Sequence, residues 1–142
     1  MAQLKLKIVT PERIVYQEMV DGVVLPTALG EITVLPRHIP LVAVLMAGEL
    51  LIKKDNQEIS MAVSGGLIEV KKNELVVLAD TAEHAHEIDI QRAEEAKKRA
   101  EELMKNKEAV DTATLAASLN KELARLKVAK KHKTRQVFIA NK

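Results

Sequence analysis

Apolar and polar residues alternate with a period of two in the first half of the chain, as in a β-strand with one buried face. Leu4, Leu6 and Ile8 occupy one face of such a strand, and Lys5 and Lys7 occupy the other. Short β-branched runs then recur between turn residues, which predicts an all-β sandwich or flattened barrel of about 8–10 short strands. The further runs are Arg13–Tyr16, Val20–Leu25, Glu31–Leu35, Leu41–Met46, Gly48–Lys53, Glu58–Val63, Leu67–Lys71 and Leu75–Ala79.

Two groups of turn residues give more specific predictions. The segment Lys53–Gln57 contains Asp55 and Asn56, which tolerate tight turns, and it predicts the tip of a β-hairpin. Gly65 and Gly66 lie at a strand boundary and predict either a β-bulge or a close approach of two backbones.

Near Asp89 the pattern changes from strand to helix. The chain from there to about Lys107 consists mainly of Ala, Glu, Lys and Arg, which favour helix, and Asp89 is a suitable N-cap. After a break at 106–108, Asp111 is predicted to cap a second helix that ends near Lys133. An apolar stripe on each helix predicts an antiparallel two-helix hairpin. The stripe residues are Ala93, Ala96, Ala100 and Leu103, and Leu115, Leu119, Leu123 and Leu126.

The alanine-rich stripe predicts weak docking of the two helices, because an alanine methyl buries little apolar area. An ordinary, stably docked hairpin is the alternative that composition leaves open. The predicted organisation is therefore a β-sandwich over residues 1–86, a mobile two-helix hairpin over 87–133 and a C-terminal extension over 134–142, to which we assign no role.

Charge and composition separate the same two halves. Residues 1–87 carry 8 Lys/Arg and 12 Asp/Glu, whereas residues 88–142 carry 14 and 8, which indicates two units with different partners. Aromatic residues make up 1% of the chain, so a sheet that stacks nucleobases is disfavoured. The chain has no cysteine and no apolar run of about 18 residues, and we expect a protein without a membrane span.

Candidate chemistry is sparse, and we expect no catalytic activity. The serines have no nearby His–Asp arrangement, and no phosphate-binding glycine loop is present. Glu83, His84, His86 and Glu87 could suggest a metal site, but a charged linker is favoured because zinc ligands usually come from two separate segments. His38 lies near two prolines and is interpreted as a turn or contact residue.

Two groups of basic residues allow more than one interpretation. The stretch Lys127–Arg135 could bind nucleic acid, anionic lipid or an acidic protein, or could be a solvated helix end. Arg92 and Arg99 share one helix face, and an antiparallel hairpin would bring Arg125 near Arg92. That arrangement could form a phosphate pocket, while surface salt bridges are the simpler interpretation of the same spacing.

Five segments of the chain carry distinctive motifs: Gly30–Leu41 (GEITVLPRHIPL), Val63–Val70 (VSGGLIEV), Leu78–Glu83 (LADTAE), Ile88–Ala93 (IDIQRA) and Arg125–Ala129 (RLKVA). In this order they resemble motifs of the epsilon subunit of bacterial F-type ATP synthases, and the resemblance covers residues from about 5 to 130. Segment Gly30–Leu41 resembles its GELGILPGHxPL signature, with Thr33 and Arg37 in place of two glycines.

The resemblance implies a rotor subunit that couples a catalytic head to a membrane ring during proton- or sodium-driven ATP synthesis. It implies that the sandwich packs on the gamma shaft and on the ring of c subunits, with Glu31, Arg37 and His38 in the ring-facing loop. The expected location is the cytoplasmic face of the plasma membrane, with peripheral attachment through the complex.

The resemblance also implies that the hairpin alternates between a compact form and an extended form that suppresses ATP hydrolysis. In the extended form, basic residues meet the alpha/beta catalytic head. No cofactor is required, although some members of the family bind a regulatory ATP on the compact hairpin. The head-contact residues are Lys121, Lys127, Lys130, Lys131 and Lys133, and the ATP-site residues are Glu83, Ile88, Asp89, Arg92, Ala93, Arg99 and Arg125.

Two other classes of function are weaker. A non-catalytic nucleic-acid- or protein-binding β-domain with a basic helical tail would need a basic, aromatic-bearing sheet to bind nucleic acid, whereas the first 87 residues are acidic. A sandwich enzyme would need an acid–base pair or a metal cluster, and the sequence offers neither.

Overall fold

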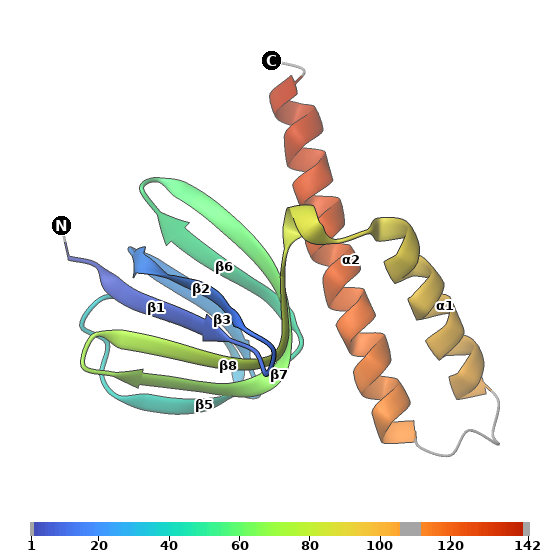
Figure 1. The fold of residues 1–142 in the computed structure, drawn as a ribbon, viewed down its shortest axis with the longest axis horizontal. Helices are drawn as coiled ribbons and strands as arrows, with labels where there is room; N and C mark the ends of the chain where they lie inside the picture. The colour runs from blue at the N-terminus through green and yellow to red at the C-terminus, as the bar shows by residue number, and fades with distance from the viewer. Residues whose placement is uncertain (1, 106–111, 141–142) are drawn as a thin grey trace.

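The computed structural model describes residues 2–105 and 112–140, and the side chains of 2–105 and 113–133. A β-sandwich of eight strands is followed by two helices, which confirms the predicted fold class (Figure 1). The elements are β1 (Leu4–Val9), β2 (Ile14–Val20), β3 (Gly22–Thr27), β4 (Gly30–Val34), β5 (Leu41–Leu45), β6 (Gly48–Lys54), β7 (Gln57–Lys71), β8 (Glu74–His84), the 3₁₀ turn η1 (Ala85–Glu87), α1 (Ile90–Lys105) and α2 (Thr112–Ala140).

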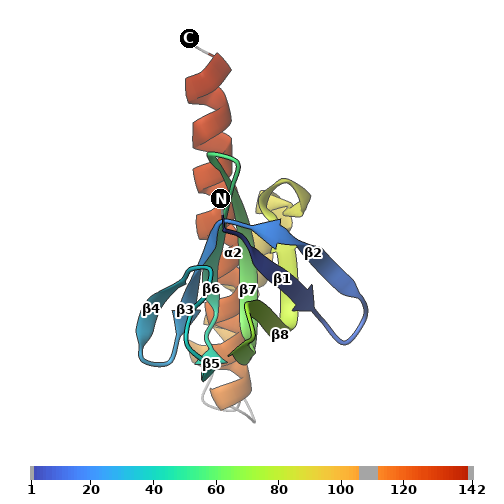
Figure 2. The same ribbon diagram turned by 90° about the vertical axis from the view of Figure 1, so that its left-hand side faces the viewer.

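The strands follow the order β2-β1-β8-β7-β5-β3-β4, and β6 pairs with β3 and β7. The β1–β8 pair is parallel, and the other recorded pairs are antiparallel. Figure 2 shows β3 and β4 on one side and β1 and β2 on the other, with α2 behind the middle. Leu4, Leu6 and Ile8 are fully buried in an aliphatic core, as the period-two pattern predicts.

The glycine pair lies inside one long strand, so the prediction of two separate strands in this region was wrong. The register with β8 is unchanged between the Ser64–Thr81 and Gly66–Ala79 pairs, so neither strand carries an extra residue and the predicted bulge is absent from this pair. A Cβ at Gly66 would lie 1.8 Å from the carbonyl oxygen of Leu78. Close approach of two backbones is therefore the reason for glycine here.

The predicted hairpin tip at Lys53–Gln57 is confirmed. Lys54 pairs with Gln57, and both residues between them have positive φ, 51° at Asp55 and 62° at Asn56. Two consecutive positive φ angles define the turn type whose twist suits a two-residue β-hairpin.

The helices lie side by side, and α2 separates α1 from the sandwich (Figure 1). The Asp89 side chain accepts a hydrogen bond of 3.2 Å from the backbone N–H of Arg92, which confirms the predicted N-cap. The predicted break at 106–108 and the cap at Asp111 lie outside the described residues. Helix α2 continues past Lys133 to Ala140, so the described part of the predicted extension belongs to the same helix.

The predicted apolar stripes are only partly correct. Ala93, Ala100 and Leu126 are buried, but Leu103 and Leu123 are exposed. Helix α2 is a middle layer, so its burial is divided between the face toward α1 and a second face toward the sandwich. The second face places Val128 and Ala129 against Ala62, Ala85 and Ile88.

Candidate functional site

The candidate site lies where α2 meets the sandwich and η1. The apolar contact there is built from alanines together with Ile88 and Val128. Small side chains let the helix approach the sheet closely but bury little apolar area. Polar contacts around this apolar patch therefore carry a larger share of the docking than they would beside a leucine-rich interface.

Arg125 forms the most enclosed ionic contact of this junction. Its Nε lies 3.0 Å from Glu83 Oε1 at the end of β8, and its Nη1 lies 2.8 Å from Glu122 Oε2 on α2. Burial alone would lower the pKa of Arg125, but the charge of Glu83 and the hydrogen bonds to Glu122 and Glu83 outweigh it and raise the pKa. The guanidinium is thus held between two carboxylates.

Lys131 supplies a second contact between α2 and the sandwich. Its Nζ lies 2.8 Å from Glu49 Oε1 on β6, and the Ser60 hydroxyl donates to Glu49 Oε2 at 2.7 Å. Burial raises the pKa of Glu49, whose side chain is 15% exposed, but the hydrogen bonds from Lys131 and Ser60 outweigh it, so the pKa is lowered. The carboxylate is therefore stabilised in its charged form while the hairpin is docked.

The remaining residues of the predicted ATP site are divided between two environments. Ile88 is buried in the junction, and Ala93 is buried on α1. Asp89 and Arg92 form an ion pair of 3.8 Å at the start of α1, where the Arg92 side chain is 84% exposed. Arg92 and Arg99 are exposed on α1, whereas Arg125 is enclosed between Glu83 and Glu122 at the junction.

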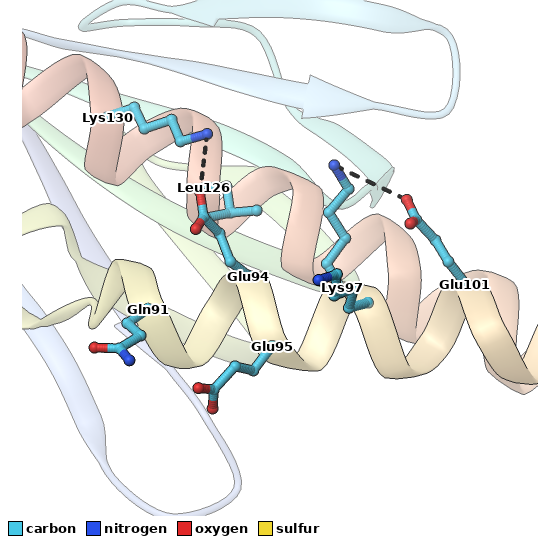
Figure 3. Close-up of a pocket in the computed structure, with 8 residues that line it drawn as sticks. Gln91, Glu94, Glu95, Lys97, Glu101, Leu126 and Lys130 are labelled. Atoms are coloured by element: carbon cyan, nitrogen blue, oxygen red, sulfur yellow. Dashed lines mark ion pairs between the residues drawn. The ribbon is translucent and has the colours of Figure 1, made fainter.

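A cleft of about 390 Å³ lies between α1 and α2, and it is lined by positively and negatively charged side chains (Figure 3). Lys130 on α2 pairs with Glu94 at 3.3 Å, and Lys97 pairs with Glu101 at 3.9 Å. The carboxylate of Glu95 points away from α2 in the same view. Lys130–Glu94 thus joins the two helices at this edge, whereas Lys97–Glu101 lies within α1, and exposed ion pairs of this kind contribute little stability.

The other predicted head-contact lysines differ in exposure. Lys127 and Lys133 are exposed on α2. Lys121 is half-buried and lines a second cavity, of about 490 Å³, between α2 and the sandwich residues Asp80 and Thr81. With the hairpin docked, part of the predicted basic surface is therefore exposed to solvent, and the rest lies against other parts of the chain.

The predicted ring-facing loop is tied to the sheet through Asn73. Arg37 has a φ of 64°, a conformation that favours glycine, which explains the glycine of the related pattern at this position. The Arg37 N–H donates to Asn73 Oδ1 at 2.9 Å, and Asn73 Nδ2 donates to the Gln3 carbonyl at 2.7 Å. Sequence reasoning missed Asn73, because its partners are far away in the chain.

Apolar side chains are exposed at the β3–β4 turn and across the sheet. Leu29, in the turn between β3 and β4, is 98% exposed, and Glu31 is exposed at the start of β4. Val44, Leu67 and Leu78 are each 50% exposed and lie in register on β5, β7 and β8. Residues paired in this way point to the same side of a sheet, so they form one exposed apolar row.

His84 and His86 flank the start of η1. Their ring centroids lie 5.3 Å apart in a stacked arrangement, and burial lowers the pKa of His84. Among residues 2–105 and 112–140, no group of three or more His, Cys, Asp and Glu side chains could hold a metal ion. No described helix is long and apolar enough to cross a membrane.

Two family models match consecutive parts of the chain. Residues 3–85 match the beta-sandwich domain of the ATP synthase delta/epsilon chain, and residues 86–130 match its long alpha-helix domain. The chain belongs to the delta/epsilon chain family of ATP synthases.

Curated relatives agree over almost the whole length of this delta/epsilon chain. It is 53% identical over 135 residues to the ATP synthase epsilon chain of Dehalococcoides mccartyi (strain CBDB1), covering 94% of this chain and 96% of the relative. It is 45% identical over 126 residues to the ATP synthase epsilon chain of Desulforamulus reducens, covering 88% of this chain and 96% of that relative.

Solved structures share the fold at lower identity. A chain of the Euglena gracilis mitochondrial ATP synthase, in a structure of OSCP, F1 and c-ring, gives a TM-score of 0.68 at 21% identity, with 96% and 82% of the two chains covered. A chain of the Tetrahymena thermophila mitochondrial ATP synthase central stalk and c-ring gives 0.54 at 17% identity, with 90% and 94% covered.

The Glu49 contact generates a test of hairpin docking. In the docked state the pKa of Glu49 is lowered, so its contribution is present above the ordinary value of 4.5 and is lost as the pH falls through the lowered pKa. We expect Glu49→Gln to weaken docking by about 1 kcal/mol at neutral pH, which corresponds to roughly a fivefold larger undocked fraction. The difference in undocked fraction between Glu49→Gln and the wild type should disappear once the pH falls below the lowered pKa of Glu49.

Fluorescence energy transfer between dyes on Asn56→Cys and Asn120→Cys would measure the undocked fraction, and the natural chain has no cysteine to interfere. Glu95→Gln is the matched control, because it removes the same charge from an exposed position on α1. An equal response of the two variants would show that the Glu49 contact does not hold the hairpin.

Proposed function

We propose that this delta/epsilon chain is a non-catalytic rotor subunit of the central stalk, which couples the catalytic head to the c-ring during proton- or sodium-driven ATP synthesis. The observation that supports it most is the match of both family domains, in order, over residues 3–130. The proposed location is the cytoplasmic face of the plasma membrane, with attachment through the complex alone.

The exposed apolar row of Val44, Leu67 and Leu78 is the proposed contact with the gamma shaft. An exposed row of this kind is typical of a protein-binding surface rather than of a solvated sheet. The loop residues Arg37 and His38, with Glu31 on β4, are the proposed contact with the c-ring.

A charge placed in the row tests the gamma contact. Leu67→Lys should lower the affinity for the gamma subunit at least about tenfold, because the ammonium would be buried against an apolar partner. Pull-down titration with purified gamma subunit measures this, and thermal unfolding of the isolated chain checks that the fold is intact. Gln57→Lys, at the exposed tip of the same strand, adds the same charge and should bind normally. Normal binding by both variants would place the gamma contact on another face.

The hairpin is proposed to restrain ATP hydrolysis by moving from the docked position to an extended one. Its interface with the sandwich consists of small apolar residues and two ionic contacts, a combination that can open at modest cost. In the extended form, Lys121, Lys127, Lys130, Lys131 and Lys133 would meet acidic segments of the alpha/beta head.

Truncation separates the rotor role from the inhibitory role. Deletion of residues 88–142 should leave assembly intact, because the proposed gamma and ring contacts lie in the sandwich, and should raise ATPase activity severalfold. Hydrolysis rates of complexes purified with either form of the subunit measure the effect. An unchanged rate would exclude inhibition by the hairpin and leave the rotor role in place.

A regulatory ATP is proposed to favour the compact form through Asp89, Arg92, Arg99 and Arg125. Ligand at ten times its Kd would stabilise that form by about 1.4 kcal/mol, enough to shift a weakly docked hairpin. In this proposal Arg92 and Arg99, which are exposed on α1, contact the phosphates.

Calorimetry of the isolated full-length chain tests the nucleotide site. We expect ATP binding by the wild type and binding at least about tenfold weaker for Arg92→Gln and Arg99→Gln, because each change removes a charge-assisted contact with phosphate. Lys98→Gln is the matched control, since it removes a cation from an exposed neighbouring position on α1. No heat at millimolar ATP would exclude the site.

A further inference from the structure

Glu122 is the least exposed carboxylate of the described side chains. The family match assigns it no role, and it is not among the residues of the proposed nucleotide site. It is 6% exposed, and its Oε2 accepts from Arg125 Nη1 at 2.8 Å. Arg125 is a residue of the proposed nucleotide site. One of its nitrogens is thus already bound to an anion of the same helix before any nucleotide arrives.

The two carboxylates on Arg125 differ in origin. Glu83 belongs to the sandwich, so its contact with Arg125 depends on the docked hairpin. Glu122 lies three residues before Arg125 on α2, so this pair moves with the helix wherever the hairpin goes. Release of the hairpin therefore frees Arg125 from Glu83 and leaves it bound to Glu122.

We infer that Glu122 sets the nucleotide affinity of the hairpin by competing with phosphate for Arg125. This inference rests on the proposed nucleotide site. Nε and Nη1 of Arg125 are engaged by carboxylates, and its Nη2 makes no hydrogen bond or ion pair with the described residues. A phosphate must either share this guanidinium with Glu122, at the cost of repulsion between two anions, or displace the carboxylate.

The expected change in ATP affinity follows from the repulsion between Glu122 and a phosphate charge in a partly enclosed site. At about 6 Å and an effective dielectric near 20, the repulsion between a carboxylate and one phosphate charge corresponds to roughly a hundredfold in affinity, and screening reduces it. Neutralising Glu122 should therefore tighten ATP binding by about tenfold. Glutamine keeps the shape of the side chain and an oxygen that can still accept from Arg125.

Calorimetric titration of ATP into the full-length chain compares the wild type, Glu122→Gln and Glu95→Gln. We expect about tenfold tighter binding for Glu122→Gln and wild-type affinity for Glu95→Gln, which removes the same charge from an exposed site on α1. Binding by Glu122→Gln alone also supports the inference. Equal or weaker binding by Glu122→Gln than by the wild type overturns it.

A double-mutant cycle shows whether Glu122 acts through Arg125. The gain from Glu122→Gln should vanish in an Arg125→Gln background, and a gain that persists there overturns the inference by assigning the effect to net charge. Arg125→Met, which also removes the cation, repeats the cycle if circular dichroism shows that Arg125→Gln is unfolded. No heat with either the wild type or Glu122→Gln at millimolar ATP overturns this inference together with the nucleotide site, while the rotor role stands.

Discussion

The pairing of β7 with its neighbours is the constraint on which the other parts of the molecule depend. This strand pairs with β6 along its first half, with β5 along its second half and with β8 from Met61 to Lys71. Continuous pairing requires the backbone at Gly66 to pass close to the Leu78 carbonyl, which a side chain would prevent. The sandwich core and the surface on which α2 rests are both built on this strand.

The position of α2 explains why the hairpin can dock on the sandwich and still be released from it. Its neighbours on one side are alanines of α1, and on the other side they are Ala62, Ala85 and Ile88. Both contacts are close in distance and small in area, so neither contributes the free energy that a leucine-rich core would. The ionic contacts of Arg125 and Lys131 carry part of the docking, and they respond to charge, salt and pH in a way that apolar contacts do not.

Local sequence signals predicted the fold class because each element carries its own period and its own turn chemistry. The alternation at Leu4–Ile8, the turn at Asp55-Asn56 and the cap at Asp89 all depend on neighbours within a few residues, and all three are present. The exposed positions of Leu103 and Leu123 were not predictable in the same way, because a helical pattern does not reveal whether one or two partners cover the helix.

The sequence predicted some of the residues of the site, but it did not predict which side chains contact one another. Motif resemblance selected Glu83 and Arg125, and the structure places them in contact. It did not select Glu122, Glu49 or Asn73, whose importance arises from partners brought close by folding. A signal for Glu122 was nevertheless present, since a carboxylate three residues before an arginine is a common helical pair.

The hydrogen bonds of Asn73 have a mechanical consequence. They join the loop at Arg37 to Gln3 next to β1, and Asn73 itself lies in the turn between β7 and β8. In a rotor with the proposed contacts, torque that enters at the ring-facing loop would pass directly into the central strands, where ladders of hydrogen bonds resist shear together. Helix α2 contributes no strand to these ladders, so the hairpin can change position without breaking their hydrogen bonds.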